Sequence, residues 1–353
     1  MAKERIISLP QTKGEFKLRG IVKGTTKNNF FEEKITKSGK QMNLVKFGVQ
    51  VSNDSTVYLD LNGMARDSVY FYKRPTEKGA KGEVKEVAWN NRKTFNEEGF
   101  ELLGIKLGLE KVINEKGQEV NDNKSYTEYD ACEKILESLM EDDSVFVRGN
   151  IEFSSFQNSK GDVIRGTKFV PSQISGTAKP VDFEDEGYEV TSDFQQVIII
   201  TGTRKDDTDP TDVKGIVEAK IVNYSTIEDA EFVCRNQKLF KTLKTKVKPF
   251  TAIKVWGDIN NKVITEEVEE DDAWGSKNSF VQVQRTFIRE LVITGADPET
   301  IDTETYTEEA IEEALSVINA NKNAKSEFGS NETNDWGSNI KSSDDSDEDD
   351  GWD

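Results

Sequence analysis

Short runs in which apolar and polar residues alternate recur along most of this chain, and they restrict its fold more than any other feature. Successive residues of a β-strand point to opposite faces, so each run predicts a strand with one buried face. We expect the first four strands to form one antiparallel sheet. Their buried positions are Phe16, Leu18, Val22, Val45, Phe47, Val49, Val51, Val57, Leu59, Leu61, Val69 and Phe71.

The next part of the chain completes a first unit. A charged, glycine-containing stretch at about 75–125 is interpreted as an insertion, with strands of its own around Leu102 to Leu109. A helix and strands at 145–153 and 167–174 follow it. In this order, several strands are followed by one helix and then by the last two strands. A five-stranded OB barrel has the same order. The helix is predicted by the i, i+3, i+4, i+7 spacing of Cys132, Ile135, Leu136 and Leu139.

The same order recurs in the second half. Strands are predicted at 197–203 and 215–224, then a helix, then strands at 251–259 and 285–293. The helix carries its apolar residues at Leu239, Leu243 and Val247.

Spacing supports a duplication. The segments VFVRGNI (145–151) and IKVWGDI (253–259) align without gaps, and Leu139 and Val247 each stand six residues before an aligned strand. In the closing strands, Phe169, Ile174 and Gly176 match Ile288, Ile293 and Gly295 at equal intervals. We therefore predict a mainly β protein with two OB-fold-like five-stranded barrels. Two unrelated small β domains are the alternative.

The C-terminal part differs in composition. Thr305 and Glu308 form a possible capping box for an amphipathic helix that docks on the core. Beyond it, Asn, Ser, Gly and acidic residues predominate, so we expect a disordered acidic tail. The predicted divisions are a first domain at 1–175, an acidic linker at 176–193, a second domain at 194–296, the helix at 297–320 and the tail at 321–353.

Charge is divided unequally along the chain. The net charge is -19, yet residues 1–93 hold 19 Lys and Arg against 10 Asp and Glu. Residues 296–353 hold 3 against 18. A basic N-terminal region therefore coexists with an acidic tail.

The composition argues against an enzyme or a metal protein. The chain has no histidine, which removes the commonest general base and zinc ligand. Cys132 and Cys234 lie far apart and form no CxxC pair. We expect no catalytic residues, no metal and no cofactor.

Cations and aromatic residues share the predicted outer faces of the first unit. Single-stranded DNA presents phosphates and open base faces, which a sequence-tolerant protein binds with such side chains. A solvated sheet face is the plainer interpretation, since Lys and Tyr are common there. The predicted DNA-binding residues of the first unit are Lys17, Arg19, Lys23, Lys46, Tyr58, Tyr70, Tyr72, Arg74 and Arg148, extended by Trp89, Arg92, Lys93, Phe153 and Phe156.

The second unit offers fewer such residues, chiefly Lys254 and Trp256. Five lysines between positions 238 and 248 form either a phosphate patch or a solvated helix face. The loop at 265–276 is acidic and would repel DNA.

The strand VFVRGNIEF (145–153), with the polar loop and closing strand after it, resembles the end of the OB domain in bacterial and phage single-stranded DNA-binding proteins. The last ten residues, DDSDEDDGWD, are similar to the acidic tip of those proteins. The resemblance implies a tip that docks on replication and repair proteins and competes with DNA. It implies this role for Asp347, Glu348, Asp349, Asp350 and Trp352. Asp353 follows the tryptophan here, whereas the family ends in the hydrophobic residue.

We therefore expect a sequence-tolerant single-stranded DNA-binding protein of replication, recombination or repair, whose tail recruits a polymerase, primase or helicase. The start MAKERIISLP lacks the features of a signal peptide, so we expect a cytoplasmic protein, in the host cell if the source is viral. An acidic interaction protein or DNA mimic is the main alternative, followed by a virion structural protein and an RNA-binding protein.

Overall fold

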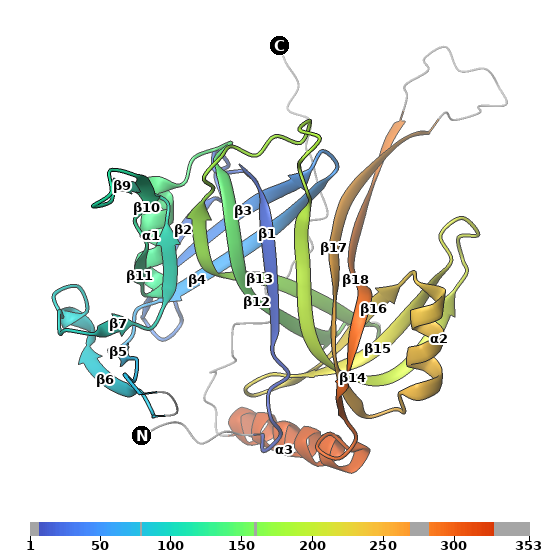
Figure 1. Cartoon of the computed structure of the whole chain (residues 1–353). Helices are drawn as coiled ribbons and strands as arrows, with labels where there is room; N and C mark the ends of the chain where they lie inside the picture. The colour runs from blue at the N-terminus through green and yellow to red at the C-terminus, as the bar shows by residue number, and fades with distance from the viewer. Residues whose placement is uncertain (1–6, 78–79, 159–160, 269–281, 328–353) are drawn as a thin grey trace, which may run out of the picture.

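The computed structural model describes residues 7–77, 80–158, 161–268 and 282–327, and this part of the chain is mainly β (Figure 1). The predicted tail residues from 328 onward, including the five proposed for partner binding, lie outside the described residues, as does most of the acidic loop at 265–276. No helix in the described ranges is both long enough and apolar enough to cross a membrane.

Five strands of the first half pair in a ring. They are β1 (Gly14–Lys23), β3 (Gln41–Ser52), β4 (Ser55–Met64), β12 (Ser144–Gln157) and β13 (Val163–Gly176). Strand β1 pairs with β3 and β12, and β3–β4 and β12–β13 are antiparallel neighbours. A parallel bridge between Leu59 and Phe169 joins β4 to β13 and returns the pairing to its start. The pattern is consistent with an OB-like sheet.

The second half repeats this arrangement. Its strands are β14 (Thr191–Asp206), β15 (Lys214–Val222), β16 (Ile227–Cys234), β17 (Thr251–Val268) and β18 (Gln282–Asp302). Strand β14 pairs with β15 and β17, β15 with β16, and β17 with β18. A parallel bridge between Val233 and Val292 joins β16 to β18. Strand β16 was not predicted from the sequence. The two rings join where β1 pairs with β14.

The link from helix to strand has the same geometry in both halves. Helices α1 (Glu128–Ser138) and α2 (Gln237–Lys246) end at Leu139 and Val247, both extended and buried. Three residues later, Asp142 and Phe250 both have positive φ, at 67° and 59°. β-Bulges then fall at Gly149 and Gly257, the glycines of the two aligned segments. The sequence alignment of these segments is therefore confirmed in three dimensions.

The alignment of the closing strands was wrong by three residues. Ile151 pairs with Phe169, and its equivalent Ile259 pairs with Leu291. Phe169 therefore corresponds to Leu291, not to Ile288. In the same way, Gly295 corresponds to Gln173 and not to Gly176. Equal spacing misled here because Ser172 is an extra, bulged residue between Phe169 and Ile174. It puts two buried residues five positions apart, a spacing that Ile288 and Ile293 share without being their equivalents.

The part of the chain between β4 and α1 departs from the predicted sheet. Strand β5 (Ser68–Lys73), expected to be the fourth strand of the sheet, instead forms a separate three-stranded sheet with β6 (Glu83–Ala88) and β7 (Phe100–Leu102). Val69 and Phe71 are buried as predicted, but in a small core with Val87. The remaining elements are β2 (Phe31–Ile35), the 3-10 turn η1 (Trp89–Asn91), β8 (Ile105–Gly108), β9 (Lys111–Ile113), β10 (Glu119–Asn121) and β11 (Lys124–Tyr126).

Two helix predictions need correction. On α1, Cys132, Ile135 and Leu139 are buried, whereas Leu136 is 44% exposed. Helix α3 (Glu308–Glu327) begins later than predicted, because residues 297–302 still belong to β18. The hydroxyl of Thr307, not Thr305, accepts a hydrogen bond from the backbone N–H of Ala310 at 3.3 Å.

Helix α3 docks on the second ring as predicted. Ile311, Ala314 and Ile318 are buried against Ile7 and Leu9 from the start of the chain. The predicted linker also packs on the body of the protein. The Tyr188 hydroxyl lies 3.1 Å from the backbone oxygen of Arg19 and 2.9 Å from that of Val51.

Candidate nucleic-acid interface

The outer face of β1, β3 and β4 brings three predicted residues together. Lys23 is directly opposite Gly48, which is directly opposite Tyr58. Residues opposite one another in a sheet project to the same side, so Lys23 and Tyr58 flank the glycine. Lys46 lies in the next outward row, opposite Asp60. We call this surface the Tyr58 face.

Tyr58 is the exposed aromatic residue at its centre. Its side chain is 53% exposed, although every second residue of the same strand is buried. A Cβ at position 48 would lie 3.4 Å from ring atom Cε1 of Tyr58. The glycine therefore leaves room for the ring to lie along the sheet, where a planar ligand can stack on it.

A basic hairpin adjoins the Tyr58 face. The segment from Lys23 to Lys46 contains six lysines and two glutamates. Lys34 pairs with Glu32 at 2.6 Å, and this contact, with a smaller effect from Lys46, holds the pKa of Glu32 below its usual value. Lys23 pairs with Asp142 and Lys40 with Asp67.

Three lysines of this region make no ion pair within the described residues: Lys27, Lys37 and Lys46. All three are exposed. The sequence prediction included Lys46 but missed Lys27, Lys34, Lys37 and Lys40. Their signal was the run of lysines between the first two main strands.

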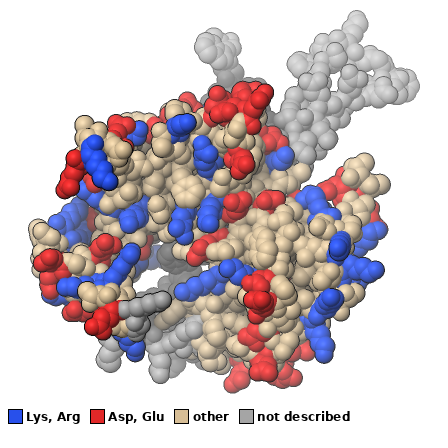
Figure 2. Space-filling view, viewed as in Figure 1, with Lys and Arg blue, Asp and Glu red and all other residues tan. Residues whose placement is uncertain are grey.

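A second group of predicted residues lies on the other side of β1. Lys17 is opposite Arg148 on β12 and opposite Asp193 on β14. Trp256 lies one row away and is 44% exposed. Its indole packs on Gly295, since a Cβ at position 295 would lie only 2.4 Å from the ring. Figure 2 shows cations and acids interspersed on this side of the molecule.

The charges on this second surface largely offset each other. Arg148 pairs with Glu15 at 4.0 Å, and Lys17 shares its row with Asp193 and Asp258. The guanidinium of Arg19 lies over the Tyr188 ring at 5.6 Å. Lys254 is half-buried. The surface therefore has less free positive charge than the Tyr58 face.

The structure separates the other predicted tyrosines from these strands. Tyr70, Tyr72 and the adjacent Arg74 belong to the three-stranded sheet and its exit, so the predicted single face with three tyrosines is wrong. Tyr70 is 46% exposed, whereas the Tyr72 ring packs on Gly82. The error arose because alternation predicts a strand but not the sheet to which it belongs.

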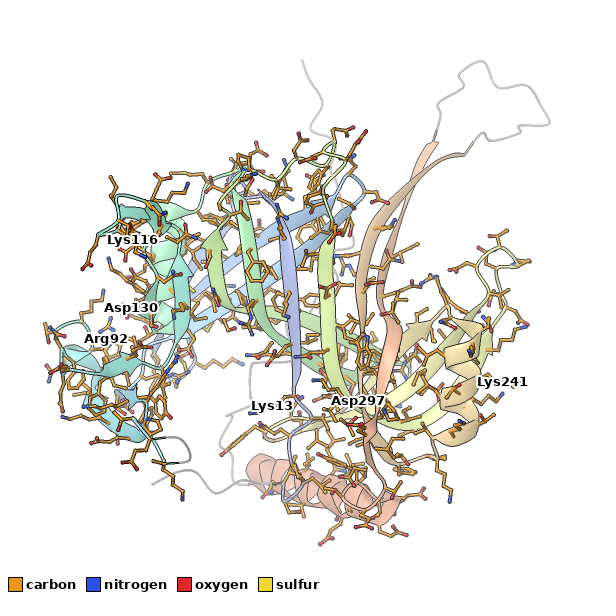
Figure 3. The ribbon with its side chains drawn as sticks, in the orientation of Figure 1. Lys13, Arg92, Lys116, Asp130, Lys241 and Asp297 are labelled. Atoms are coloured by element: carbon orange, nitrogen blue, oxygen red, sulfur yellow. The ribbon has the colours of Figure 1, made fainter. Side chains whose placement is uncertain are left out.

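Arg92 and Lys93 are held by a buried carboxylate. Arg92 donates to both oxygens of Asp130, at 2.7 and 2.9 Å, and Lys93 lies 3.1 Å from Asp130 (Figure 3). The Trp89 ring stacks on the Arg92 guanidinium at 3.9 Å. Burial disfavours ionisation of Asp130, but hydrogen bonds from Arg92, Thr127 and Lys93 outweigh it and lower the pKa. These residues anchor the insertion on α1.

The two predicted phenylalanines of β12 differ. Phe153 is 6% exposed and packs against Phe232 in the core, so it is not available to a ligand. Phe156 is 36% exposed near the tip of the β12–β13 hairpin. The hairpin continues further than predicted, which keeps Phe153 within the alternating pattern.

The chain was compared with curated protein sequences, solved structures and protein-family models. No curated protein sequence matches it. The wild-type single-stranded DNA-binding protein of Thermus aquaticus is similar in structure at 10% identity and a TM-score of 0.37, over 82% of this chain and 93% of that one. A deletion mutant of the same protein gives 9% identity and a TM-score of 0.36, over 81% and 94%. The model of one family, YorF, matches residues 75–331, and the chain therefore belongs to the YorF family.

Proposed function

We propose that this protein binds single-stranded DNA with little sequence preference on the Tyr58 face, and that each five-strand ring is an OB barrel. The first barrel corresponds to residues 1–175 and the second to 194–296. The observation that carries the proposal is the half-exposed Tyr58 ring beside Gly48, with Lys23 on the other side of the glycine and Lys46 in the next row.

The physical basis is a match between this surface and an unpaired strand. Stacking of a base on an aromatic ring contributes about 1–3 kcal/mol and accepts any base. Lys46 in the next row, and Lys27 and Lys37 in the adjoining hairpin, make no ion pair with a described residue and can contact phosphates. In OB barrels the second and third strands, here β3 and β4, form the usual binding face for oligonucleotides.

The proposed role is protection of single strands during replication, recombination or repair. It requires binding and no catalysis, which agrees with a chain that contains no histidine. Such a role would place the protein in the cytoplasm.

Titration of a fluorescent oligo-dT at two salt concentrations tests the proposal. Binding should weaken as salt rises, because phosphate contacts release counterions. Tyr58→Ala should weaken binding about tenfold through lost stacking, with little change in salt dependence. Tyr70, 46% exposed on the separate sheet, provides the matched control, and Tyr70→Ala should bind like the wild type. Absence of oligo-dT binding at low salt would end the proposal and favour a DNA mimic.

We also propose that the acidic tip recruits a replication protein through Trp352, flanked by Asp347, Glu348, Asp349 and Asp350. Trp352→Ala keeps the charge of the tip and removes its apolar anchor. Pull-downs from the native host should lose a polymerase, primase or helicase with this variant. Identical partners for both proteins would leave the tip as a purely solubilising extension.

A further inference from the structure

Helix α2 and the turn after it carry a concentration of positive charge that the Tyr58 face does not include. Lys238, Lys241, Lys244, Lys246 and Lys248 are all exposed. Lys241 is labelled on α2 at the right of Figure 3, where Figure 2 shows a row of cations along the edge of the molecule. None of the five makes an ion pair with any described residue.

The helix geometry brings three of these lysines close together. Phe240 and Leu243 face the core, so the opposite side of α2 is open. Lys238, Lys241 and Lys244 follow one another at intervals of three, which places their side chains along one side of the helix. Like charges at this spacing repel one another. The arrangement therefore costs stability in the free protein.

The fold does not require these lysines. Leu243 and Val247 of α2 correspond to Ile135 and Leu139 of α1, as the matched helix ends show. At the same offset, Lys238 corresponds to Asp130 and Lys241 to Glu133. Two helices in equivalent positions thus carry opposite charge. The favourable effect of cations at a helix C-terminus accounts for Lys244 and Lys246 but not for Lys238 or Lys241, which lie nearer the start.

The chemistry of the helix surface indicates the class of ligand. Between the lysines, the exposed residues are Thr242 and Thr245, and the one aromatic residue of α2, Phe240, is buried. The surface can therefore attract phosphates but offers no ring on which a base could stack.

We infer that α2 is a second nucleic-acid site, which binds the phosphodiester backbone and accepts double-stranded DNA. It differs from the Tyr58 face, whose ring requires an unpaired base. A protein with both surfaces can hold a single strand on the first barrel and the adjoining duplex on the second. The α2 surface needs no contribution from Tyr58, so the two proposals can fail separately.

The test uses the full-length protein and a short blunt-ended DNA duplex, which offers no single strand. The variant Lys238→Gln/Lys241→Gln/Lys244→Gln should bind the duplex about tenfold more weakly at low salt. The slope of log K against log salt should fall by about 2 to 3, because three phosphate contacts are lost. The control variant is Lys81→Gln/Lys116→Gln/Lys179→Gln, which removes the same charge from exposed positions elsewhere. It should retain most of the affinity and the slope.

Three outcomes would overturn the inference. They are no binding of the duplex by the wild type, wild-type binding by the α2 variant, and an equal loss of affinity in both variants. Competition with poly-glutamate adds a further outcome: tight binding of that peptide to α2 with unchanged duplex binding would assign the helix to an acidic protein. Tyr58→Ala should leave duplex affinity unchanged. If oligo-dT binding fails while duplex binding depends on α2, the proposed function is wrong and this inference stands. A thermal unfolding temperature no lower than that of the wild type would exclude misfolding of the variants.

Discussion

The two five-strand units share the same strand pairing but carry different side chains at equivalent surface positions. The backbone oxygens of Val22 and Ile200 accept equivalent hydrogen bonds, from Asp142 at 3.0 Å and Phe250 at 2.7 Å. Val22 therefore corresponds to Ile200. Following the strand pairs from these two residues, Gly48 on β3 corresponds to Glu218 on β15. In the same way, Tyr58 on β4 corresponds to Glu231 on β16. A ring over a glycine in one unit thus becomes a pair of carboxylates in the other.

Glu218 and Glu231 form ion pairs with other residues of the protein. Arg204 lies 3.2 Å from Glu218 and 3.4 Å from Glu231, and Arg165 from the first unit lies 3.2 Å from Glu231. Beside them, the hydroxyl of Ser155 donates to Glu228 at 2.6 Å. The β12–β13 hairpin of the first unit therefore occupies the surface that corresponds to the Tyr58 face. The equivalent surfaces therefore differ in their surroundings, since the hairpin of the other unit contacts one of them while Tyr58 on the other stays exposed.

The largest expected effect comes from placing the second unit's residue in the first. Tyr58→Glu should weaken oligo-dT binding about 100-fold, or about 2.7 kcal/mol, since it removes stacking and adds a charge that repels phosphate. Fluorescence titration measures the loss. An affinity within threefold of wild type would show that the equivalence of the two faces has no functional meaning.

The two equivalent bulges allow a test of whether both units need a glycine at the same backbone position. A Cβ at Gly149 would lie 2.0 Å from the backbone oxygen of Val170, and one at Gly257 would lie 1.8 Å from that of Val292. Either substitution by alanine forces the backbone to move, and each should lower the free energy of unfolding by about 2 kcal/mol. Chemical denaturation provides the measurement. Gly117→Ala, in an open turn with no atom near the added carbon, controls for loss of glycine alone but adds strain at its φ of 73°.

A smaller effect is expected from a single cation of the Tyr58 face. Lys46→Gln should weaken oligo-dT binding a few-fold and reduce the salt slope by about 0.7 to 1, the share of one phosphate contact. Lys116→Gln, on the distant β9–β10 hairpin turn, should change neither quantity. Loss of affinity without a change in slope would mean that Lys46 acts by supporting the fold.

Local patterns in the sequence predicted most strands and helices. They did not predict which strands pair with one another. The alternation at Phe16, Leu18 and Val57 predicted buried faces, which the structure confirms. It could not show that Tyr70 belongs to a different sheet, because an alternating strand reads the same in any sheet. Strand β16 was missed although its second half contains the buried Phe232, because acidic residues interrupt the apolar pattern in its first half.

The smallest effect is expected from the reverse exchange, and it tests whether a ring alone makes a binding surface. Glu231→Tyr gives the second unit the aromatic residue of the first, but position 231 faces Glu218 across the sheet and Arg165 from the hairpin. Stacking there would require the hairpin to move, and Glu218 would repel the approaching phosphates. Oligo-dT affinity should therefore stay within about twofold of wild type, because the hairpin covers the new ring and a base cannot stack on it. A gain of tenfold or more in the same titration would show that the hairpin does not close this surface, and that the two units differ by one side chain rather than by their packing.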